Sequence, residues 1–421
     1  MTIMDETLYD VIIIGGGPAG MMSAGRAASR GAKVLLLEKN PDVGKKLLIT
    51  GGGRCNVTNA EENIRKFLAN YKDSDKFLFS AFSQYSVVDV LNFFHKHGME
   101  TKTEDNGRVF PVTDSARTVY EVIKNYLKDN KVKIENKAEV KNIIADNKKI
   151  SSVILADGRT LKAHSFILAT GGKSRPDTGS TGDGFKWLKT LGHTIIEPDV
   201  SLVPITIKED WIKNLAGITL PKTKITIFQD NKKQFSRTGK ILFTHIGLSG
   251  PTILNMSKNV RELLNYGKVM IQLDLFPDQN EGELDNILIN LFQENNKQLK
   301  NSLATILPNA LVITLLNQST ISPEIKCHSI TRENRKTLVK LLKTFSLSVK
   351  GLLGTNKAII TSGGVALTEV NFKTMQSRLY DNLYIIGDLL NIDRPSGGFS
   401  LQLCWTTGYV AGNSIEVENN K

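Results

Sequence analysis

The stretch Ile12-Ile13-Ile14-Gly15-Gly16-Gly17-Pro18-Ala19-Gly20 decides the fold of this chain. An apolar strand from Asp10 to Ile14 is expected to lead into a turn whose Gly15, Gly17 and Gly20 match G-x-G-x-x-G. The helix that follows, from about Pro18 to Arg30, would aim free N–H groups and a positive dipole end at phosphates. A second apolar strand, Val34 to Leu37, ends at Glu38, which is suited to accept ribose hydroxyls. The pattern predicts an α/β fold that begins with a dinucleotide-binding βαβ unit.

The far end of the chain indicates which dinucleotide is bound. A strand from Leu383 ends at Gly387 and Asp388, where glycine permits close approach and a carboxylate suits a polyol such as ribityl. Gly397 and Gly398 are expected to open an amphipathic helix through Ala411, with its N-terminus beside an isoalloxazine ring. The buried run from Phe166 to Gly172 ends in Gly-Gly and returns the chain to the cofactor. These features favour FAD over NAD.

Three longer runs carry a resemblance to a known family. They are Gly51-Gly52-Gly53-Arg54-Cys55-Asn56-Val57-Thr58-Asn59, Thr244-His245-Ile246-Gly247-Leu248-Ser249-Gly250-Pro251 and Gly397-Gly398-Phe399-Ser400-Leu401-Gln402. The chain resembles, from Asp10 to Gly412, the BaiN-type family of bacterial flavoproteins, also called the HI0933-like or aminoacetone oxidase family. Phe399 and Ser400 replace the tyrosine and asparagine of the family's last run. The resemblance implies a Rossmann-like, two-dinucleotide-binding FAD domain with an inserted β-barrel and helical domain.

The predicted FAD-contacting residues come from several segments. Arg54 is suited to neutralise phosphate and Asn56 to bond a flavin or ribityl edge, while Cys55 has no cysteine partner nearby and is expected to pack beneath the cofactor. The full predicted set is Gly15, Gly17, Pro18, Ala19, Gly20, Glu38, Lys39, Lys45, Arg54, Cys55, Asn56, Val140, Thr170, Gly171, Gly172, Gly387, Asp388, Gly398, Phe399 and Leu401.

Length and composition limit the classes of protein to which this chain can belong. A chain of 421 residues with 40% apolar content is long enough for two or three domains. No apolar run reaches the roughly 18 residues of a membrane span, and three scattered cysteines fit a reducing compartment, so a cytoplasmic protein is expected. The spacing of His, Cys, Asp and Glu predicts no metal site. The net charge of +12 raises the question of nucleic acid, but the lysines are scattered and lack interleaved aromatic residues, which argues against that partner.

The order of the motifs predicts an insertion. The flavin motifs occupy the first 200 and last 50 residues, so the chain must leave the cofactor domain and return. Short β-like runs predict a β-barrel-like domain over 199–277, and helical spacing of leucines, with Thr331 as an N-cap and Phe345 in the last helical run, predicts a helical domain over 278–345. The FAD domain is expected over 1–198 and 346–421.

Two residues are candidates for chemistry at the substrate. His245, in a strand that ends in a glycine-rich turn, is suited either to exchange a proton with a substrate or to tie down the turn. Arg394 is suited either to bind a carboxylate or to clamp the loop before Gly397. No second G-x-G-x-x-G follows a strand after Glu38, so any NAD(P)H would bind transiently between the FAD domain and the insertion.

The sequence therefore predicts an FAD-dependent oxidoreductase that exchanges hydride with a small organic substrate. The BaiN resemblance implies NAD(P)H-fed reduction of an activated carbon–carbon double bond, which we favour over oxidation of an amine such as aminoacetone by oxygen. An RNA-modifying flavoprotein and a non-catalytic flavin-binding or redox-sensing protein are further alternatives. Oligomeric state is not indicated.

Overall fold

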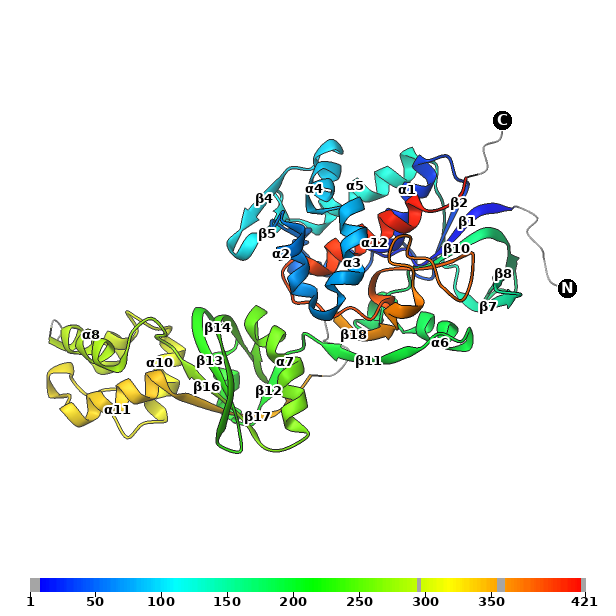
Figure 1. Cartoon of the computed structure of the whole chain (residues 1–421). Helices are drawn as coiled ribbons and strands as arrows, with labels where there is room; N and C mark the ends of the chain where they lie inside the picture. The colour runs from blue at the N-terminus through cyan, green and yellow to red at the C-terminus, as the bar shows by residue number, and fades with distance from the viewer. Residues whose placement is uncertain (1–7, 294–296, 354–359, 418–421) are drawn as a thin grey trace. The chain divides into compact units, whose positions relative to one another are not determined.

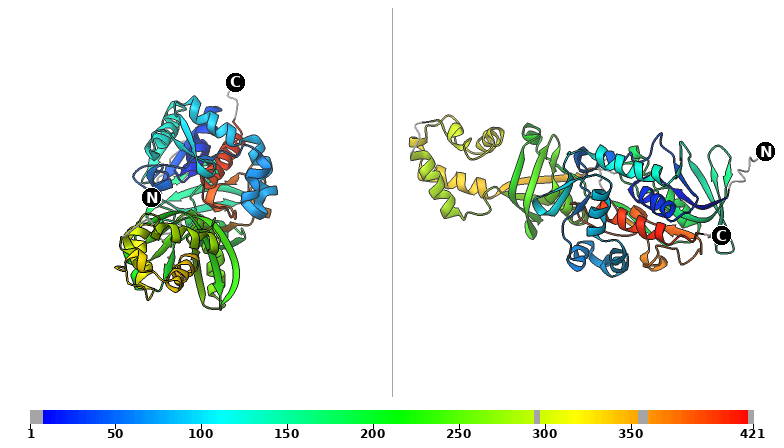
Figure 2. Two further views of the ribbon diagram at one scale, coloured as in Figure 1. Left: turned by 90° about the vertical axis from the view of Figure 1, so that its left-hand side faces the viewer. Right: turned by 90° about the horizontal axis from the view of Figure 1, so that it is seen from above.

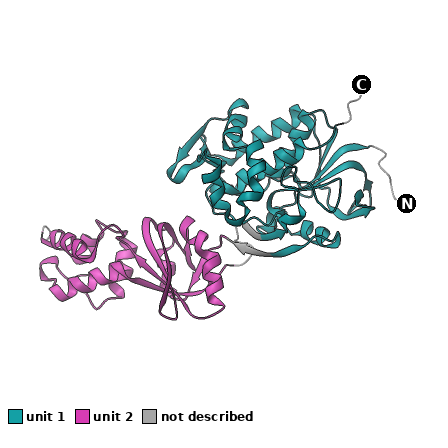
Figure 3. Ribbon diagram, in the orientation of Figure 1, with its two compact units in different colours: residues 1–200, 358–421 teal, residues 201–357 magenta. Residues whose placement is uncertain are grey.

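Two compact units make up the chain in a computed structural model that describes residues 8–293, 297–353 and 360–417. Unit 1 comprises residues 1–200 and 358–421, and unit 2 comprises residues 201–357 (Figure 3). The division confirms that one insertion interrupts the flavin motifs. Each unit has its own apolar core.

Unit 1 is built on a five-stranded parallel sheet in the order β19-β10-β1-β2-β6. Strands β1, β2 and β19 are almost wholly buried apolar runs, as expected where helices cover both faces of a parallel sheet, whereas β6 is polar and partly exposed. The sheet strands are β1 (Tyr9–Ile14), β2 (Val34–Glu38), β6 (Lys133–Asn136), β10 (Ala163–Leu168) and β19 (Leu383–Ile385). The carboxyl ends of parallel strands share one edge, so the segments after β1, β2, β10 and β19 lie along that edge.

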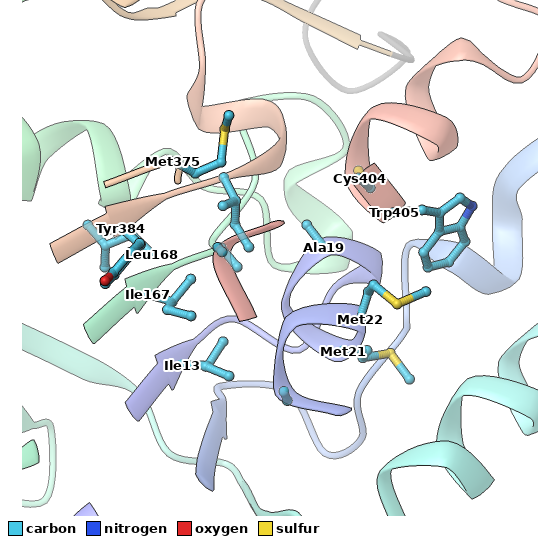
Figure 4. Close-up of a cluster of buried hydrophobic side chains, with 14 of the residues drawn as sticks. Ile13, Ala19, Met21, Met22, Ile167, Leu168, Met375, Tyr384, Cys404 and Trp405 are labelled. Atoms are coloured by element: carbon cyan, nitrogen blue, oxygen red, sulfur yellow. The ribbon is translucent and has the colours of Figure 1, made fainter. Parts of the chain in front are cut away.

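Helices α1 (Pro18–Ser29) and α12 (Phe399–Asn413) pack directly against each other although they are far apart in sequence. Figure 2 shows them side by side, blue and red. Gly408 and Gly412 permit this contact, since an added Cβ would lie 2.4 Å from the carbonyl oxygens of Ala19 and Ser23 respectively. Figure 4 shows Met22 of α1 and Trp405 of α12 in the core they share. The prediction that α12 is amphipathic is wrong, because apolar and small residues are buried on every side of it.

The remaining elements of unit 1 cover the sheet or extend from it. Helices α2 (Ile64–Leu68), α3 (Asp75–Gln84), α4 (Val87–Lys96), α5 (Ala116–Asp129) and α6 (Asp183–Thr190) are present. The short strands β3 (Thr58–Asn59), β4 (Thr101–Glu104) and β5 (Arg108–Pro111) form one small sheet, β7 (Val140–Asp146), β8 (Lys149–Leu155) and β9 (Thr160–Leu161) form another, and β11 (Ile195–Ser201) pairs with β18 (Ile360–Val365).

One helical stretch, Ile64–Lys96, is long and apolar enough by length and composition to be a candidate membrane span. It contains the separate helices α2, α3 and α4, none longer than ten residues, whereas a span needs about 20. Phe67, Phe82 and Phe94 from this stretch are buried in the core of unit 1. The stretch is therefore a group of short core helices.

Unit 2 is a closed barrel in the order β12-β15-β14-β13-β16-β17, with a helical segment inserted between two of its strands. The strands are β12 (Ile205–Ile207), β13 (Thr219–Gln229), β14 (Lys232–Thr244), β15 (Gly247–Ser249), β16 (Val269–Asp274) and β17 (Phe345–Leu352). Helix α7 (Pro251–Leu264) packs on β14, and α8 (Glu281–Gln293), α9 (Leu299–Leu303), α10 (Asn309–Asn317) and α11 (Arg332–Lys343) follow β16.

The predicted domain boundaries at 277 and 345 differ from the structure. Phe345 does not end a helix but begins β17, which pairs with β16 and β12 and closes the barrel. The barrel and the helices also share one apolar core, so they form a single unit. The predicted N-cap is confirmed, because the Thr331 side chain accepts a hydrogen bond from the backbone N–H of Asn334 at 3.2 Å.

Candidate cofactor site

A cleft lies along the carboxyl edge of the parallel sheet of unit 1. Its empty volume, which includes space open to solvent, is about 890 Å³. The ends of β1, β2 and β10 line it, as do the N-terminus of α1 and the residues that follow β19. An extended ligand laid along this edge would pass from Glu38 across Gly15–Pro18 to Thr170 and then to Asp388.

The glycine turn after β1 is required by close backbone contacts. A Cβ at Gly20 would lie 1.9 Å from the carbonyl oxygen of Gly15, and Gly15 itself has φ of +109°. At Gly17, in contrast, no atom lies within 4 Å of the Cβ position, so that face is free for a ligand. Gly17 caps α1 without a side-chain hydrogen bond, which leaves the first N–H groups of the helix available to an anion.

Glu38 is buried at the end of β2 and holds the glycine turn in place. One carboxylate oxygen accepts the N–H of Gly16 at 2.9 Å, and the other accepts the backbone N–H and the side-chain amide of Asn40 at 2.8 and 2.7 Å. A carboxylate has about four acceptor positions, so this arrangement leaves one for a further donor. A ribose hydroxyl fits that position.

We expect Glu38→Ala to weaken retention of FAD by roughly tenfold or more, since one charge-assisted hydrogen bond contributes about 1.5–3 kcal/mol. FAD dissociation from the full-length protein, followed by the fluorescence of released flavin, measures the effect. Glu38→Gln, which keeps an acceptor oxygen, should lie between wild type and the alanine variant. Unchanged retention in Glu38→Ala would rule out this residue as the ribose ligand.

At the opposite end of the cleft, Asp388 lies between two cations. Its carboxylate pairs with the guanidinium of Arg394 and with the Lys46 ammonium, whose Nζ lies 3.4 Å from Oδ2. Burial raises the pKa of the Asp388 carboxyl, but the Arg394 and Lys46 charges outweigh burial and hold the pKa below its ordinary value. Arg394 also donates to the backbone oxygen of Ile392 and to Ser400 Oγ. The structure therefore gives Arg394 the role of a clamp on the loop before α12.

One residue that lines the cleft, Thr170, carries a buried polar atom without a partner in the described part of the chain. The hydroxyl of Thr170, directly after β10, is buried and has no hydrogen-bond partner among the described residues. Buried hydroxyls rarely remain unpaired, so the atom indicates a missing partner. Together with the open Gly17 face and the free acceptor position on Glu38, it shows that the residues present fit an extended dinucleotide.

The structure brings twelve of the predicted FAD-contacting residues to the cleft and leaves eight outside its lining. The twelve are Gly15, Gly17, Pro18, Ala19, Glu38, Lys39, Lys45, Val140, Thr170, Gly171, Gly387 and Asp388. Outside the lining are Gly20, Arg54, Cys55, Asn56, Gly172, Gly398, Phe399 and Leu401. Gly20 contributes indirectly, because its close contact with Gly15 shapes the glycine turn. Most of the other seven residues belong to two segments, Gly51–Asn59 and Gly398–Gln402, which pack on each other.

The Gly51–Asn59 segment is held by contacts that the sequence analysis did not find. The Arg54 guanidinium pairs with Glu104 and Asp114, which raise its pKa, and lies over the Phe110 ring. Arg54 is thus engaged by protein carboxylates and not placed at the cleft. Asn56 keeps a buried side-chain oxygen without a partner among the described residues.

The two segments outside the lining meet at Thr58. A Cβ at Gly398 would lie 2.2 Å from the Thr58 carbonyl, and Thr58 Oγ1 donates to Gln402 Oε1 at 2.6 Å. Cys55, three residues before Thr58, is buried, and burial raises the pKa of its thiol to about 12. The thiol is therefore protonated at neutral pH, as expected for a packing residue.

Sequence reasoning missed several lining residues. Lys46 pairs with Asp388, Asn40 bonds Glu38, and the half-buried Trp187 of α6 lines the cleft beside Val140 with its indole N–H donating to the Lys141 carbonyl at 3.2 Å. Lys46 could have been predicted, because it directly follows Lys45, which the sequence already indicated as a cofactor contact. Trp187 could not have been predicted, because no local pattern indicates that α6 packs against the start of β7.

His245 lies in unit 2, in the two-residue turn that joins β14 to β15. Its side chain is exposed, and among the described residues its ring makes no hydrogen bond. Thr244 and Ile246 hold the turn instead, through Thr244 Oγ1 to the Gly247 carbonyl and the Ile246 carbonyl to the N–H of Ile207. The alternative that His245 ties down the turn is therefore not supported. Within the described part of the chain, no three His, Cys, Asp or Glu side chains gather as metal ligands.

Comparison with known proteins supports the cofactor. A family model described as HI0933-like protein Rossmann domain matches residues 9–414. The chain is 30% identical to a 3-dehydro-bile acid delta(4,6)-reductase of Clostridium scindens and 31% identical to a ribosomal RNA dihydrouridine synthase of Haemophilus influenzae, each over 96% of this chain and 98% of the relative. A ribosomal RNA dihydrouridine synthase of Escherichia coli is 28% identical.

Solved structures share the fold at low sequence identity. A 3-ketosteroid delta1-dehydrogenase from Sterolibacterium denitrificans is similar with a TM-score of 0.56 and 12% identity, over 97% of this chain and 99% of that chain. A flavocytochrome c3 fumarate reductase is similar with a TM-score of 0.55 and 14% identity, over 97% of this chain and 78% of that chain. At these identities the likeness concerns the fold alone.

Proposed function

The chain belongs to the HI0933-like family of FAD-dependent oxidoreductases, and we propose that it reduces an activated carbon–carbon double bond at the expense of NAD(P)H. The observation that carries the proposal is the full-length similarity to relatives named for two such reactions, a bile acid reductase and a dihydrouridine synthase. Both names describe addition of two hydrogens across a double bond. The dinucleotide-shaped cleft of unit 1 supports a flavin as the hydride carrier.

The roles of the residues follow from the cleft. The N-terminus of α1 would face the pyrophosphate, Glu38 the ribose, and Asp388 the ribityl chain. Asp388 stays ionised between Lys46 and Arg394, so it accepts hydrogen bonds instead of donating them. When bound, the flavin supplies hydride transfer, while these residues bind and orient it.

We expect anaerobic NADPH or NADH to bleach the visible band of the oxidised flavin in the purified protein. No second G-x-G-x-x-G follows a strand after Glu38, so a nicotinamide would bind transiently and leave after transfer. Stopped-flow absorbance measures the bleaching. If neither nicotinamide bleaches the flavin and an amine does so, with peroxide formed on addition of oxygen, the protein is an amine oxidase and the proposal fails.

We keep His245 as the proposed proton donor to the carbon that does not receive hydride. We expect His245→Ala to lower turnover of an unsaturated substrate by about 10²–10⁴-fold, the range for loss of a general acid. Bleaching by nicotinamide should persist, because that half-reaction needs no such donor. Ile246→Ala, which changes the neighbouring exposed residue of the same turn, is the matched control. Wild-type turnover in His245→Ala would remove the histidine from the mechanism.

A second candidate function is reduction of a uridine in RNA. One specific observation favours it: residues 201–357, the whole of unit 2, contain 21 Lys and Arg against 12 Asp and Glu, or +9 of the chain's +12. A concentration of positive charge on one unit favours binding of a polyanion such as RNA, because it attracts the phosphate groups. Dihydrouridine formation in a uridine-containing RNA, detected by mass spectrometry of nucleosides, would establish this candidate.

A further inference from the structure

The longest segment of unit 2 without Asp or Glu contains strand β14 and the turn with His245. Residues 231–261 contain six Lys and Arg and no Asp or Glu. The segment covers β14, β15 and most of α7. Four of its cations, Lys232, Lys233, Arg237 and Lys240, follow one another on β14, and we call them the β14 strip. All four side chains are exposed.

The β14 strip lies on a strand with a free edge. β14 pairs with β13 from Lys232 to Leu242, a long green hairpin in Figure 1, but pairs with β15 only from Leu242 to Thr244. Over Lys232–Ile241, therefore, no described strand occupies the other edge of β14. Such an edge presents unpaired backbone N–H groups, and backbone N–H groups are among the donors that bind phosphate oxygens.

The charges of the β14 strip are not neutralised within the protein. Some other basic residues of unit 2 have carboxylate partners, as in the Lys222–Asp278, Arg335–Asp285 and Lys343–Asp274 pairs. Among residues 8–293, 297–353 and 360–417, the charged ends of the β14 strip form no ion pair and no hydrogen bond. Because side chains alternate along a strand, these cations lie on both faces of β14, and together with its unpaired N–H groups they fit a phosphodiester chain that runs along the strand edge.

We propose that the β14 strip binds the sugar–phosphate backbone of single-stranded RNA. The proposal rests on the second candidate function and deepens it, because β14 continues directly from Lys240 to the His245 turn. At about 3.3 Å per residue, Lys240 lies within roughly 16 Å of His245 along the strand, or a few nucleotides of extended RNA. The strip would hold the strand while a uridine reaches the proposed proton donor.

The test compares two triple variants with the same loss of charge. Lys233→Gln, Arg237→Gln and Lys240→Gln remove three cations of the strip, and Arg332→Gln, Lys336→Gln and Lys340→Gln remove three exposed cations of α11. Binding of a fluorescein-labelled, uridine-rich RNA of about 20 nucleotides to the full-length holoprotein is followed by anisotropy over a range of salt. We expect the strip variant to reduce the magnitude of the negative slope of log affinity against log salt by about 2, given about 0.7 per phosphate contact on single strands. The α11 variant should match wild type.

Other outcomes overturn the inference. Equal losses in the two variants would mean diffuse attraction, and unchanged RNA affinity with new self-association of the strip variant would mean that the lysines only protect the edge from pairing with another chain. Binding to anionic lipid vesicles but not to RNA would exclude RNA as the partner. Bleaching of the flavin by NADPH distinguishes the two proposals. If NADPH bleaches the flavin but the protein does not bind RNA, only the proposal for the β14 strip fails. If the β14 strip binds RNA but NADPH does not bleach the flavin, only the proposed reductase activity fails.

Discussion

Replacing Asp388 with alanine is expected to cost about 3–5 kcal/mol of folding stability, because it leaves the Arg394 guanidinium buried without its counter-charge. The Arg394 side chain is 1% exposed, and its other partners, Ile392 O and Ser400 Oγ, are neutral. The same change removes the acceptor expected to face the ribityl chain. The variant should therefore unfold at lower denaturant concentration and lose its yellow colour.

Chemical denaturation with and without added FAD separates the two effects of Asp388→Ala. Asp177→Ala is the matched control, since Asp177 pairs with Arg175 at the surface, where such pairs contribute less than about 1 kcal/mol. If the two variants lose the same stability, the Asp388 pair contributes no more than a surface pair.

The Asp388 pair also predicts a dependence of stability on pH. The pKa of Asp388 is lower in the folded protein than its ordinary value of 3.8, so the folded state favours the ionised form. The contribution is complete above that value and is lost as pH falls through the folded pKa below it. Asp388→Asn should therefore show a flatter decline of unfolding free energy below about pH 4 than wild type.

Gly20→Ala should prevent α1 from docking on the turn after β1. The added Cβ would lie 1.9 Å from the Gly15 carbonyl oxygen, a backbone atom that cannot move without displacing the strand. Overpacking in well-packed regions typically costs about 1–3 kcal/mol, and a clash with backbone lies at or above the upper end. We expect a loss of about 3 kcal/mol and protein purified without FAD.

Gly17→Ala is the matched control for this glycine turn. No atom lies within 4 Å of its Cβ position, and its φ of −77° suits any residue, so its unfolding free energy should stay within about 0.5 kcal/mol of wild type. FAD affinity should nevertheless fall, because the new methyl group occupies the face left free for the pyrophosphate. Equal unfolding free energies for the two variants would contradict the close-contact role of Gly20.

Much of unit 1 was predictable from the sequence because its signals are local. The βαβ unit, the strand that ends before Thr170 and the strand that ends before Asp388 are patterns of neighbouring residues, and their edge in a parallel sheet follows from the fold class. The barrel was predictable from short alternating runs for the same reason. The prediction of an amphipathic α12 failed because its burial comes from α1, α3, α4 and the Thr58 segment, none of which is near it in sequence.

Sequence by itself determined the FAD fold, the existence of the insertion and most of the cleft, since apolar periodicity and glycine spacing act over a few residues. Tertiary structure alone decided which charges meet. Arg54 reaches Glu104 and Asp114 across 50 and 60 residues, Lys46 reaches Asp388 across 342, and Phe345 joins a barrel begun at Ile205. The physical reason is that ion pairs and strand partners depend on distance in space, which no local pattern encodes.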